Sequence, residues 1–515
     1  MICQDKKLLD TVIAYIDKQA PIYSVICEKH YDIEHPIDAE VSDRLKKLVL
    51  RDDDDAYKLF IYLSDIKDIW SLIIEKSIKC LRYFDKREPF LELESKHPVA
   101  YGVEDLKNYF EKYTQFESML YGGGKFYRDH VVHVFRVWLL GLQCLLEADG
   151  EYLKRIQIQK NVHINNLEKI SIWSMIALTH DLGYPLEKAQ EILEKTKDMM
   201  KSFVSNPTLS MDLSFNGIQN NMNDYVVRFL SSKMHEYNNE DSMDSPKTFV
   251  ARLQPKYYFK FQKSLEGYKH GILSSIIIYK LLIYFLESDF SINEDYTFDE
   301  EESRQFYIRR EILRTIAAHT CKDVYHLDML NFAFLLIMVD DAQEWGRKQI
   351  SELYISDKQS EYEFESITPE FDIKTTTLNG KEIHVHSFVA KERFSFSKED
   401  IDSAKQILSH LMEQCKGYEQ IFRDGQDTAI RNFVFTKNVE VRIHEPKTVI
   451  FDVSIIISND ERPKYEICVR NENKDLKSSY DQKFLESIYK NCKINKIQEI
   501  SKSEIKYEVY GRGRV

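Results

Sequence analysis

The sequence predicts a mainly α protein, with an all-helical core, a helical N-terminal extension and a smaller C-terminal α+β domain. Glycine and proline, which interrupt helices, are scarce, with 16 and 11 occurrences. Apolar side chains recur at helical spacing up to about residue 350, whereas alternating patterns and turn signals follow residue 351. We therefore expect domains at residues 1–104, 105–350 and 351–515.

The N-terminal extension, residues 1–104, is expected to be helical. The segments 56–63 and 69–75 each carry apolar side chains at helical spacing. The acidic run RDDDD at 51–55 precedes the first of them. Because carboxylates favour helix N-termini, a solvated helix start explains this run better than a metal-binding loop.

The longest helical pattern extends over 105–350, where we expect the catalytic domain. Between its helices, 205–222 and 237–250 are rich in Asn, Ser, Asp and Met and lack a clear period, so loops are expected there. The predicted helices are 128–148, 167–181, 186–203, 223–236, 258–288, 301–319 and 329–350.

Residues 351–515 are expected to form a separate α+β domain, to which the sequence assigns no role. Asn379-Gly380 lies between two alternating segments and predicts a β-hairpin over 373–386. His384 and His386 alternate on its second strand and share one face. Because no third ligand is evident, an exposed sheet face explains them better than a metal pair. The other predicted elements are a helix at 397–421 and strands at 431–444, 447–458 and 464–470.

Composition and charge argue against several classes of protein. The formal net charge of −13 disfavours a general surface for duplex nucleic acid, although it leaves room for a local basic nucleotide pocket. No run approaches about 18 uninterrupted apolar residues, so no membrane span is expected. The cysteines are scattered without a Cys-x-x-Cys pair, and the N-terminus MICQDKK does not resemble a secretory signal. A cytoplasmic protein with reduced thiols is the simplest interpretation.

Histidines and aspartates form a spaced series in or beside apolar stretches. A buried imidazole or carboxylate is costly without a partner, and one metal ion can satisfy several of them. A single histidine on an apolar helix is more often a satisfied core residue, but a series with every member on a predicted helix is more specific. Its members are His130, His133, His180-Asp181, His270, His319 and Asp340-Asp341.

Ligand chemistry and spacing favour a metal centre in this series. His130 and His133 are three residues apart, so they share a helix face. Neutral imidazole suits divalent transition metal ions such as Fe, Mn, Zn, Co and Ni, and carboxylate adds hard oxygen ligands, which also leaves Mg²⁺ open. One ion can be held by His133, the His180-Asp181 pair and a terminal aspartate. The two histidines downstream are then available for a second ion, and a metal pair can clamp both oxygens of a phosphoryl displacement.

This order of motifs resembles the HD-domain metal-dependent phosphohydrolase superfamily over about residues 120–350. The superfamily is all-helical and most members hydrolyse phosphoesters, so the resemblance implies that fold and that activity. The motifs that carry it are His133-x-x-Arg136-Val137, His180-Asp181-x-Gly183, His270-Gly271, His319 and Asp340.

The resemblance also implies a ligand set. His133 corresponds to the first ligand, and His180-Asp181 to the pair that names the superfamily. His270 and His319 are similar to the two extra histidines of the binuclear subgroup, which includes the HD-GYP proteins. The full HD-GYP signature is absent, so cleavage of cyclic dinucleotides is not favoured.

Two positions of the resemblance leave alternatives. The last ligand is Asp340 or Asp341. We prefer Asp340, because it directly follows the apolar run, as the superfamily's final aspartate does. Asp341 stays open as the alternative. Many members carry lysine where this chain has Tyr184. Lys188, one turn further along, could replace that lysine if the helix begins at Pro185.

Other residues are candidates for proton transfer or phosphate binding. His130 lies three positions before the first ligand. Mammalian-type cyclic nucleotide phosphodiesterases place a proton-donating histidine four positions before it. His130 could therefore be a general acid or a supporting structural histidine, and both roles stay open. Lys125 and Arg128 follow three glycines, which is typical of a phosphate-binding turn or of an ordinary flexible turn. Arg347 could bind substrate phosphate or pair with a neighbouring glutamate.

The sequence therefore predicts a metal-dependent phosphohydrolase that acts on a nucleotide or phosphodiester through a metal-activated water. Two other classes stay open: a di-iron HD-type oxygenase, and a metal-retaining nucleotide sensor or interaction protein with little turnover. The expected partner is a small-molecule substrate. The C-terminal domain could also support a homo-oligomer or bind a partner protein.

Overall fold

The computed structural model describes residues 3–27, 33–49, 59–85, 102–123, 130–159, 162–203, 218–237, 247–286, 292, 296–321, 323–324 and 330–343, and the strands that follow them. The chain divides into two compact units. The helical unit comprises Met1–Val324, Leu330–Val339 and Arg347–Ile350, and the sheet unit comprises Tyr325–Met329, Asp340–Gly346 and Ser351–Val515. The three-domain division expected from the sequence stays a prediction.

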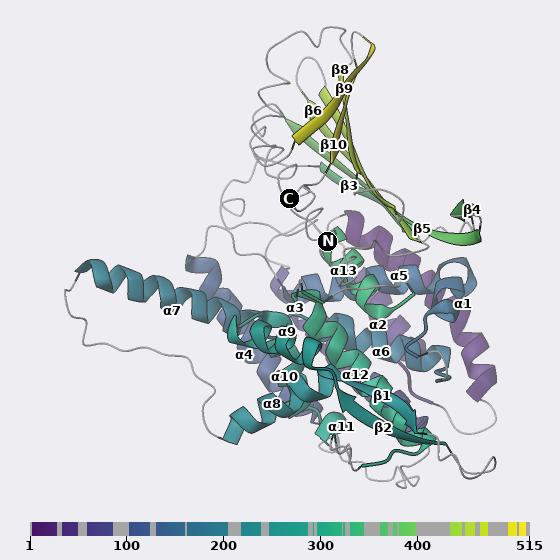
Figure 1. The fold of residues 1–515 in the computed structure, drawn as a ribbon, viewed down its shortest axis with the longest axis vertical. Helices are drawn as coiled ribbons and strands as arrows, with labels where there is room; N and C mark the ends of the chain where they lie inside the picture. Colours follow the sequence, from purple (N-terminus) through teal and green to yellow (C-terminus); the bar gives the residue numbers. More distant parts are fainter. Residues whose placement is uncertain are drawn as a thin grey trace. The chain divides into compact units, whose positions relative to one another are not determined.

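The helical unit confirms the mainly α fold class (Figure 1). Its helices agree with the apolar periodicity, and one small hairpin interrupts them. These elements are α1 (Cys3–Cys27), α2 (Ala39–Val49), α3 (Leu59–Tyr83), α4 (Val103–Gly123), α5 (Val131–Arg155), α6 (Asn166–Thr179), α7 (Tyr184–Phe203), α8 (Ile218–Ser231), β1 (Ser232–Tyr237), β2 (Thr248–Leu253), α9 (Pro255–Glu266), α10 (His270–Leu281), α11 (Ile283–Leu286), α12 (Glu300–His319) and α13 (Phe332–Ala342), whose last three residues continue past the unit boundary.

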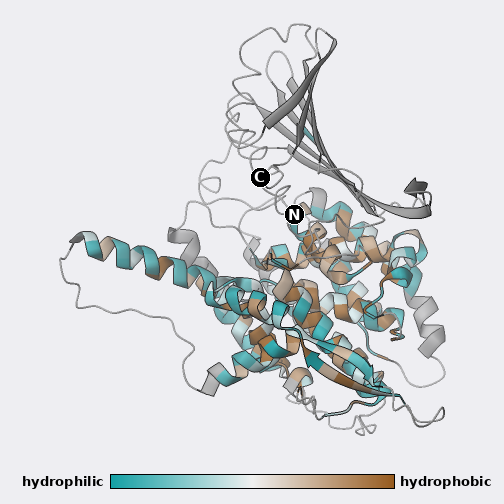
Figure 2. Cartoon of the chain, viewed as in Figure 1, coloured by the Kyte–Doolittle hydropathy of each residue, from teal (hydrophilic) through white to brown (hydrophobic). Residues whose placement is uncertain are grey.

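Tight contact between α5 and α6 forms the centre of the core. Trp138 and Trp173 are both fully buried, and the Trp173 indole N–H donates to the Trp138 carbonyl oxygen over 3.2 Å. A Cβ atom at Gly141 would lie 1.9 Å from the Trp173 ring, so only glycine lets the ring lie against α5. Figure 2 shows hydrophobic residues gathered inside the helical unit, whereas α7 is mainly hydrophilic. This packing fixes the two helices that carry the first histidines of the series.

Helix α5 is also long and apolar enough to cross a membrane, judged by length and composition alone. However, 83% of its apolar window is buried inside the structure. The core helix of a globular protein passes the same test, so α5 is weak evidence for a membrane span.

Two predicted helices differ from the structure. The helix predicted at 258–288 is divided, because α9 ends before Gly267 and Tyr268 adopts a left-handed φ of 50°. As a result His270 begins α10 instead of lying inside a helix. The helix predicted at 223–236 ends at Ser231, where β1 begins and pairs with β2 in antiparallel register. The predicted loop over 237–250 therefore contains the start of β2.

Buried and half-buried ion pairs attach the N-terminal helices to the rest of the helical unit. The Arg136 guanidinium of α5 donates to both carboxylate oxygens of Asp5 in α1, over 2.8 and 2.7 Å. The Lys76 ammonium of α3 pairs with Asp38 and Glu40 at the start of α2. The acidic run at 51–55 lies outside the described residues.

The sheet unit is described by its strands alone. Its eight-stranded sheet has the order β3-β5-β6-β7-β8-β10-β9, with β4 paired to β5. All neighbours are antiparallel except β5 and β6. The strands are β3 (Glu361–Thr368), β4 (Lys374–Leu378), β5 (Lys381–Ser397), β6 (Phe433–His444), β7 (Val449–Ser458), β8 (Lys464–Asn471), β9 (Lys493–Ser501) and β10 (Glu504–Tyr510).

The hairpin and the strands predicted in this unit are confirmed. Leu378 pairs with Lys381 at the end of the antiparallel β4-β5 ladder, and β6, β7 and β8 match the strands predicted at 431–444, 447–458 and 464–470. The strands β3, β9 and β10 were not predicted. Parallel pairing of β5 with β6 requires a crossover connection between these two strands. The helix predicted at 397–421 lies outside the described residues, apart from Ser397, which belongs to β5.

His35, just before α2, makes the stability of the helical unit depend on pH. Burial, opposed by Asp38 and aided by Lys76, lowers its pKa from 6.5 to about 4. The folded pKa is depressed, so protonation of the unfolded chain removes stability as pH falls from about 6.5 toward 4. We expect His35→Gln to reduce the loss of unfolding free energy between pH 7 and pH 5 by about 2 kcal/mol, measured by urea denaturation. Equal losses in both proteins would contradict this assignment.

Candidate metal centre

Four helices deliver the histidines of the predicted series to one place. His133 lies in the first turn of α5, and His180 and Asp181 follow the end of α6. His270 is the first residue of α10 and His319 is the last residue of α12. The site is therefore built where helices begin or end, and the side chains converge from segments far apart in the sequence.

Asp181 lies between two pairs of imidazoles. Its Oδ2 is 3.7 Å from His133 Nε2 and 3.5 Å from His180 Nε2. Its Oδ1 is 3.3 Å from His270 Nε2 and 3.6 Å from His319 Nε2. The carboxylate is almost completely buried. Each of its oxygens thus faces its own pair of ring nitrogens.

Backbone carbonyls orient two of the rings. His180 Nδ1 lies 2.8 Å from the carbonyl oxygen of Ala177, and His319 Nδ1 lies 2.6 Å from that of Ile316. A carbonyl can only accept, so Nδ1 carries the proton in both rings. The Nε2 lone pairs are then available at the centre of the cluster, as metal-ligating histidines require.

Electrostatics keep Asp181 ionised. Burial acts to raise its pKa, but the adjacent His180, His319 and His270 side chains together hold the pKa well below its usual range. Burial lowers the pKa of His319, the adjacent Asp181 opposes this, and the neighbouring imidazoles His270 and His180 lower it further. Asp181 is therefore ionised, and burial favours the uncharged form of His319. These are the protonation states in which both groups bind metal ions.

Two sets of side chains have the spacing of a metal site. His180, Asp181 and His319 form one set, and His133, His180 and Asp340 form the other. The ligand atoms of each set lie within 4.8 Å of one another. These buried His/Asp groups could hold a metal ion. Of the two half-buried terminal aspartates, Asp340 belongs to the second of these sets and Asp341 belongs to neither.

Two glycines allow the helices to approach closely enough for this geometry. A Cβ atom at Gly183 would lie 2.4 Å from the His270 carbonyl oxygen and 2.7 Å from the Ser274 nitrogen. A Cβ atom at Gly271 would lie 2.6 Å from a backbone oxygen of α12 and 3.0 Å from His319 Cε1. The glycines in the two motifs therefore have a packing function.

Ser274 and Glu187 support the site, and the sequence analysis identified neither. The Ser274 hydroxyl accepts from the Gly183 N–H over 2.8 Å and lies 2.6 Å from the His180 carbonyl oxygen. The Glu187 carboxylate lies 2.6 Å from His270 Nδ1. Burial acts to raise the Glu187 pKa, but the contacts with His270 and a neighbouring lysine lower it to about 2.

His130 and Lys188 lie beside the cluster, together with Tyr184. The His130 ring is buried at the start of α5 and stacks on the Tyr184 ring with centroids 3.8 Å apart. Its centroid is 6.2 Å from that of His133. The Lys188 ammonium lies 5.2 Å from the Tyr184 ring and pairs with Glu191 over 2.9 Å. The other candidates, Lys125, Arg128 and Arg347, lie outside the described residues.

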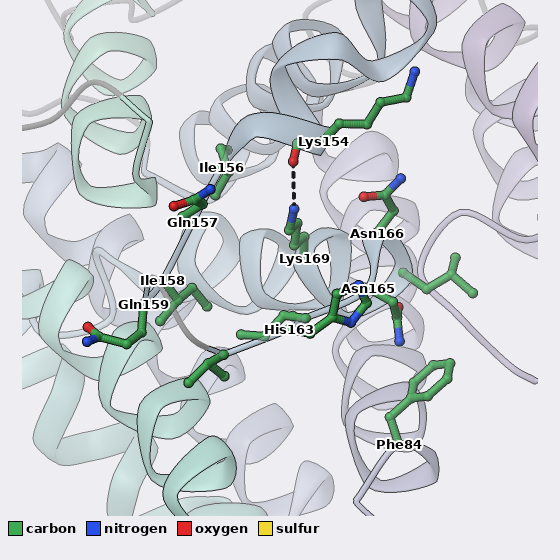
Figure 3. Close-up of a pocket in the computed structure, with 13 residues that line it drawn as sticks. Phe84, Lys154, Ile156, Gln157, Ile158, Gln159, His163, Asn165, Asn166 and Lys169 are labelled. Atoms are coloured by element: carbon green, nitrogen blue, oxygen red, sulfur yellow. Dashed lines mark hydrogen bonds between the residues drawn. The ribbon is translucent and has the colours of Figure 1, made fainter. Parts of the chain in front are cut away.

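A separate pocket of about 660 Å³ lies between the end of α5 and the start of α6 (Figure 3). Amide side chains and isoleucines line much of it, and the Lys169 ammonium donates to the Lys154 carbonyl oxygen within it. It shares no residue with the histidine cluster.

Comparisons of the chain with protein-family models, with curated proteins and with solved structures found no match. The resemblance to the HD-domain superfamily is thus not confirmed by a family model. The structure supports a mainly helical protein with buried His/Asp groups that could bind metal.

The close approach at Gly183 can be tested by adding one methyl group. We expect Gly183→Ala to lower the free energy of unfolding by about 1–3 kcal/mol, because the new Cβ meets backbone atoms of α10 that have no free space to move into. Gly267→Ala is the matched control, since its Cβ would meet no atom closer than 3.4 Å. The measurement is urea denaturation of metal-free protein. Similar stabilities of the two variants would refute the packing argument.

Proposed function

We propose that this chain is a metal-dependent phosphohydrolase that acts on a nucleotide or phosphodiester and holds two divalent transition metal ions. The observation that carries the proposal is the position of Asp181, whose two carboxylate oxygens face separate pairs of imidazole nitrogens. A carboxylate in that position is suited to bridge two ions. A single structural ion would need only one of the two carboxylate oxygens and one pair of imidazoles.

The donor set fits such a pair. The inner position would be held by His133, His180, Asp340 and Asp181 Oδ2, and the outer position by His270, His319 and Asp181 Oδ1. One set contains His180 from the inner position and His319 from the outer position, together with Asp181. This agrees with a carboxylate that the two positions share. Because the donors are mainly imidazole, Fe, Mn, Zn, Co or Ni suits the site better than Mg²⁺.

The chain's own residues provide the other elements of a hydrolytic site. Bound ions would supply an activated water and charge neutralisation on phosphoryl oxygens. His130, held by its stack on Tyr184, lies next to the cluster and is suited to protonate the leaving oxygen. Lys188 places a positive charge beside Tyr184, where it can attract an anionic substrate.

Metal content provides the first test of this proposal. We expect about two transition metal ions per chain after purification without chelators, and fewer in His133→Ala and His270→Ala, because each variant loses one ligand. His163→Ala is the control, since His163 is exposed and lines the separate pocket. Elemental analysis measures the content. No metal after reconstitution, or the same loss in His163→Ala, would rule the centre out.

The reaction is then identified with a panel of nucleotides and phosphodiesters, with oxygen uptake recorded in parallel. Phosphate or nucleotide release supports the hydrolase. Oxygen consumption by an iron-loaded protein without phosphoester cleavage would instead assign a di-iron oxygenase. Tight nucleotide binding without turnover would assign a sensor.

Proton donation by His130 predicts a dependence on the leaving group. We expect His130→Gln to lower kcat about 10²–10⁴-fold for an alkyl phosphodiester, with metal content unchanged. The loss should be much smaller for a p-nitrophenyl ester, whose leaving group needs no protonation. An equal loss for both esters would show that His130 only supports the ligands.

A further inference from the structure

The outer position differs from the inner one in how its histidines are held. The side chains of His133 and His180 are fully buried, and that of His319 is 3% exposed. The side chain of His270 is 21% exposed, so it lies at the rim of the cluster. An imidazole at the rim needs a specific contact to hold its ring plane and its tautomer.

His270 cannot use the contact that orients the other rings. His180 and His319 end their helices, so each ring can reach a carbonyl three residues earlier in its own helix. His270 begins α10, and the chain before it is the Gly267-Tyr268 turn. The orienting group must therefore come from another element.

Glu187 of α7 supplies that group. Its Oε2 accepts the backbone N–H of His270 over 2.8 Å and lies 2.6 Å from His270 Nδ1. Its Oε1 accepts from the Lys269 ammonium over 2.9 Å. Together these contacts fix the carboxylate, place the proton on Nδ1 and direct the Nε2 lone pair of His270 toward Asp181.

We propose that Glu187 is a positioning residue that sets the metal affinity of the outer position through His270. This rests on the proposed binuclear centre. A carboxylate partner makes an imidazole more basic and a stronger ligand, and loss of such a partner typically weakens metal binding 10–100-fold. Because α7 also carries Tyr184, which stacks on His130, docking of this one helix determines both the outer metal position and the proton donor.

Glu187→Gln separates positioning from a merely structural role. A glutamine has the same size, and it can still accept the backbone N–H of His270 when its amide oxygen takes the place of Oε2. If its amide nitrogen faces the ring, His270 must take the Nε2-protonated tautomer, which cannot ligate through Nε2. If its amide oxygen faces the ring, its amide nitrogen faces the Lys269 ammonium and cannot accept a hydrogen bond from it. In either orientation the negative charge of Glu187 is lost.

The experiment is a calorimetric titration of the metal-free full chain with Co²⁺. We expect two binding events in the wild type, of which Glu187→Gln weakens one about 10–100-fold and leaves the other within about 2-fold. Glu187→Asp should recover part of the loss. Glu191→Gln, the same substitution one turn along α7 at an exposed ion pair, should bind as the wild type does.

A double variant assigns the effect to the outer position. In a His270→Ala background, Glu187→Gln should cause no further loss, because the residue through which it acts is absent. Unchanged binding in Glu187→Gln, equal weakening of both events, or full additivity with His270→Ala would overturn the proposal while leaving the binuclear centre intact. A wild type that binds fewer than two Co²⁺ ions would overturn the proposed function and this inference together.

Discussion

The helical unit is organised around the need to keep the Asp181 carboxylate charged in the protein interior. Removing a carboxylate from water costs several kcal/mol unless close polar partners replace the solvent. Here the replacement is a shell of imidazoles, brought by α5, α6, α10 and α12. A metal cation held at this cluster would complete the shell, because it compensates the carboxylate charge directly.

The N-terminal helices support the same centre. The Trp70 indole N–H of α3 donates to the Leu178 carbonyl oxygen over 2.8 Å, and the Tyr109 hydroxyl of α4 donates to the Leu182 carbonyl oxygen over 2.8 Å. The Leu178 carbonyl lies in the last turn of α6, where a helix leaves its last acceptors without intrahelical donors, and Leu182 lies in the turn that follows. Residues Leu178 and Leu182 flank the His180-Asp181 pair, so this part of the chain fixes the backbone that presents the central ligands.

The sequence allowed the fold class and the convergence of the histidines to be predicted, because both depend on repeated patterns. Helical periodicity is local, and a buried polar residue in each apolar segment indicates a shared partner. The division of the 258–288 helix was harder to predict, since Tyr268 adopts a positive φ without being a glycine. Gly267 was the one local signal for a helix end there.

The supporting residues could not be found in this way. Glu187 and His270 are 83 positions apart in the chain, and Ser274 reaches a carbonyl 94 positions away. Neither contact leaves a periodic signal, because each depends on how two helices dock. A carboxylate one turn after a His-Asp-x-Gly motif is a feature that could be examined in future sequences.

The central claim is that Asp181 bridges two metal ions. The most direct measurement is an anomalous difference map from crystals of metal-loaded protein, recorded on both sides of the absorption edge. The account predicts two peaks about 3.5–4 Å apart, one between Asp181 and the inner histidines and one between Asp181 and the rim histidines. A single peak, or a peak away from Asp181, would contradict it.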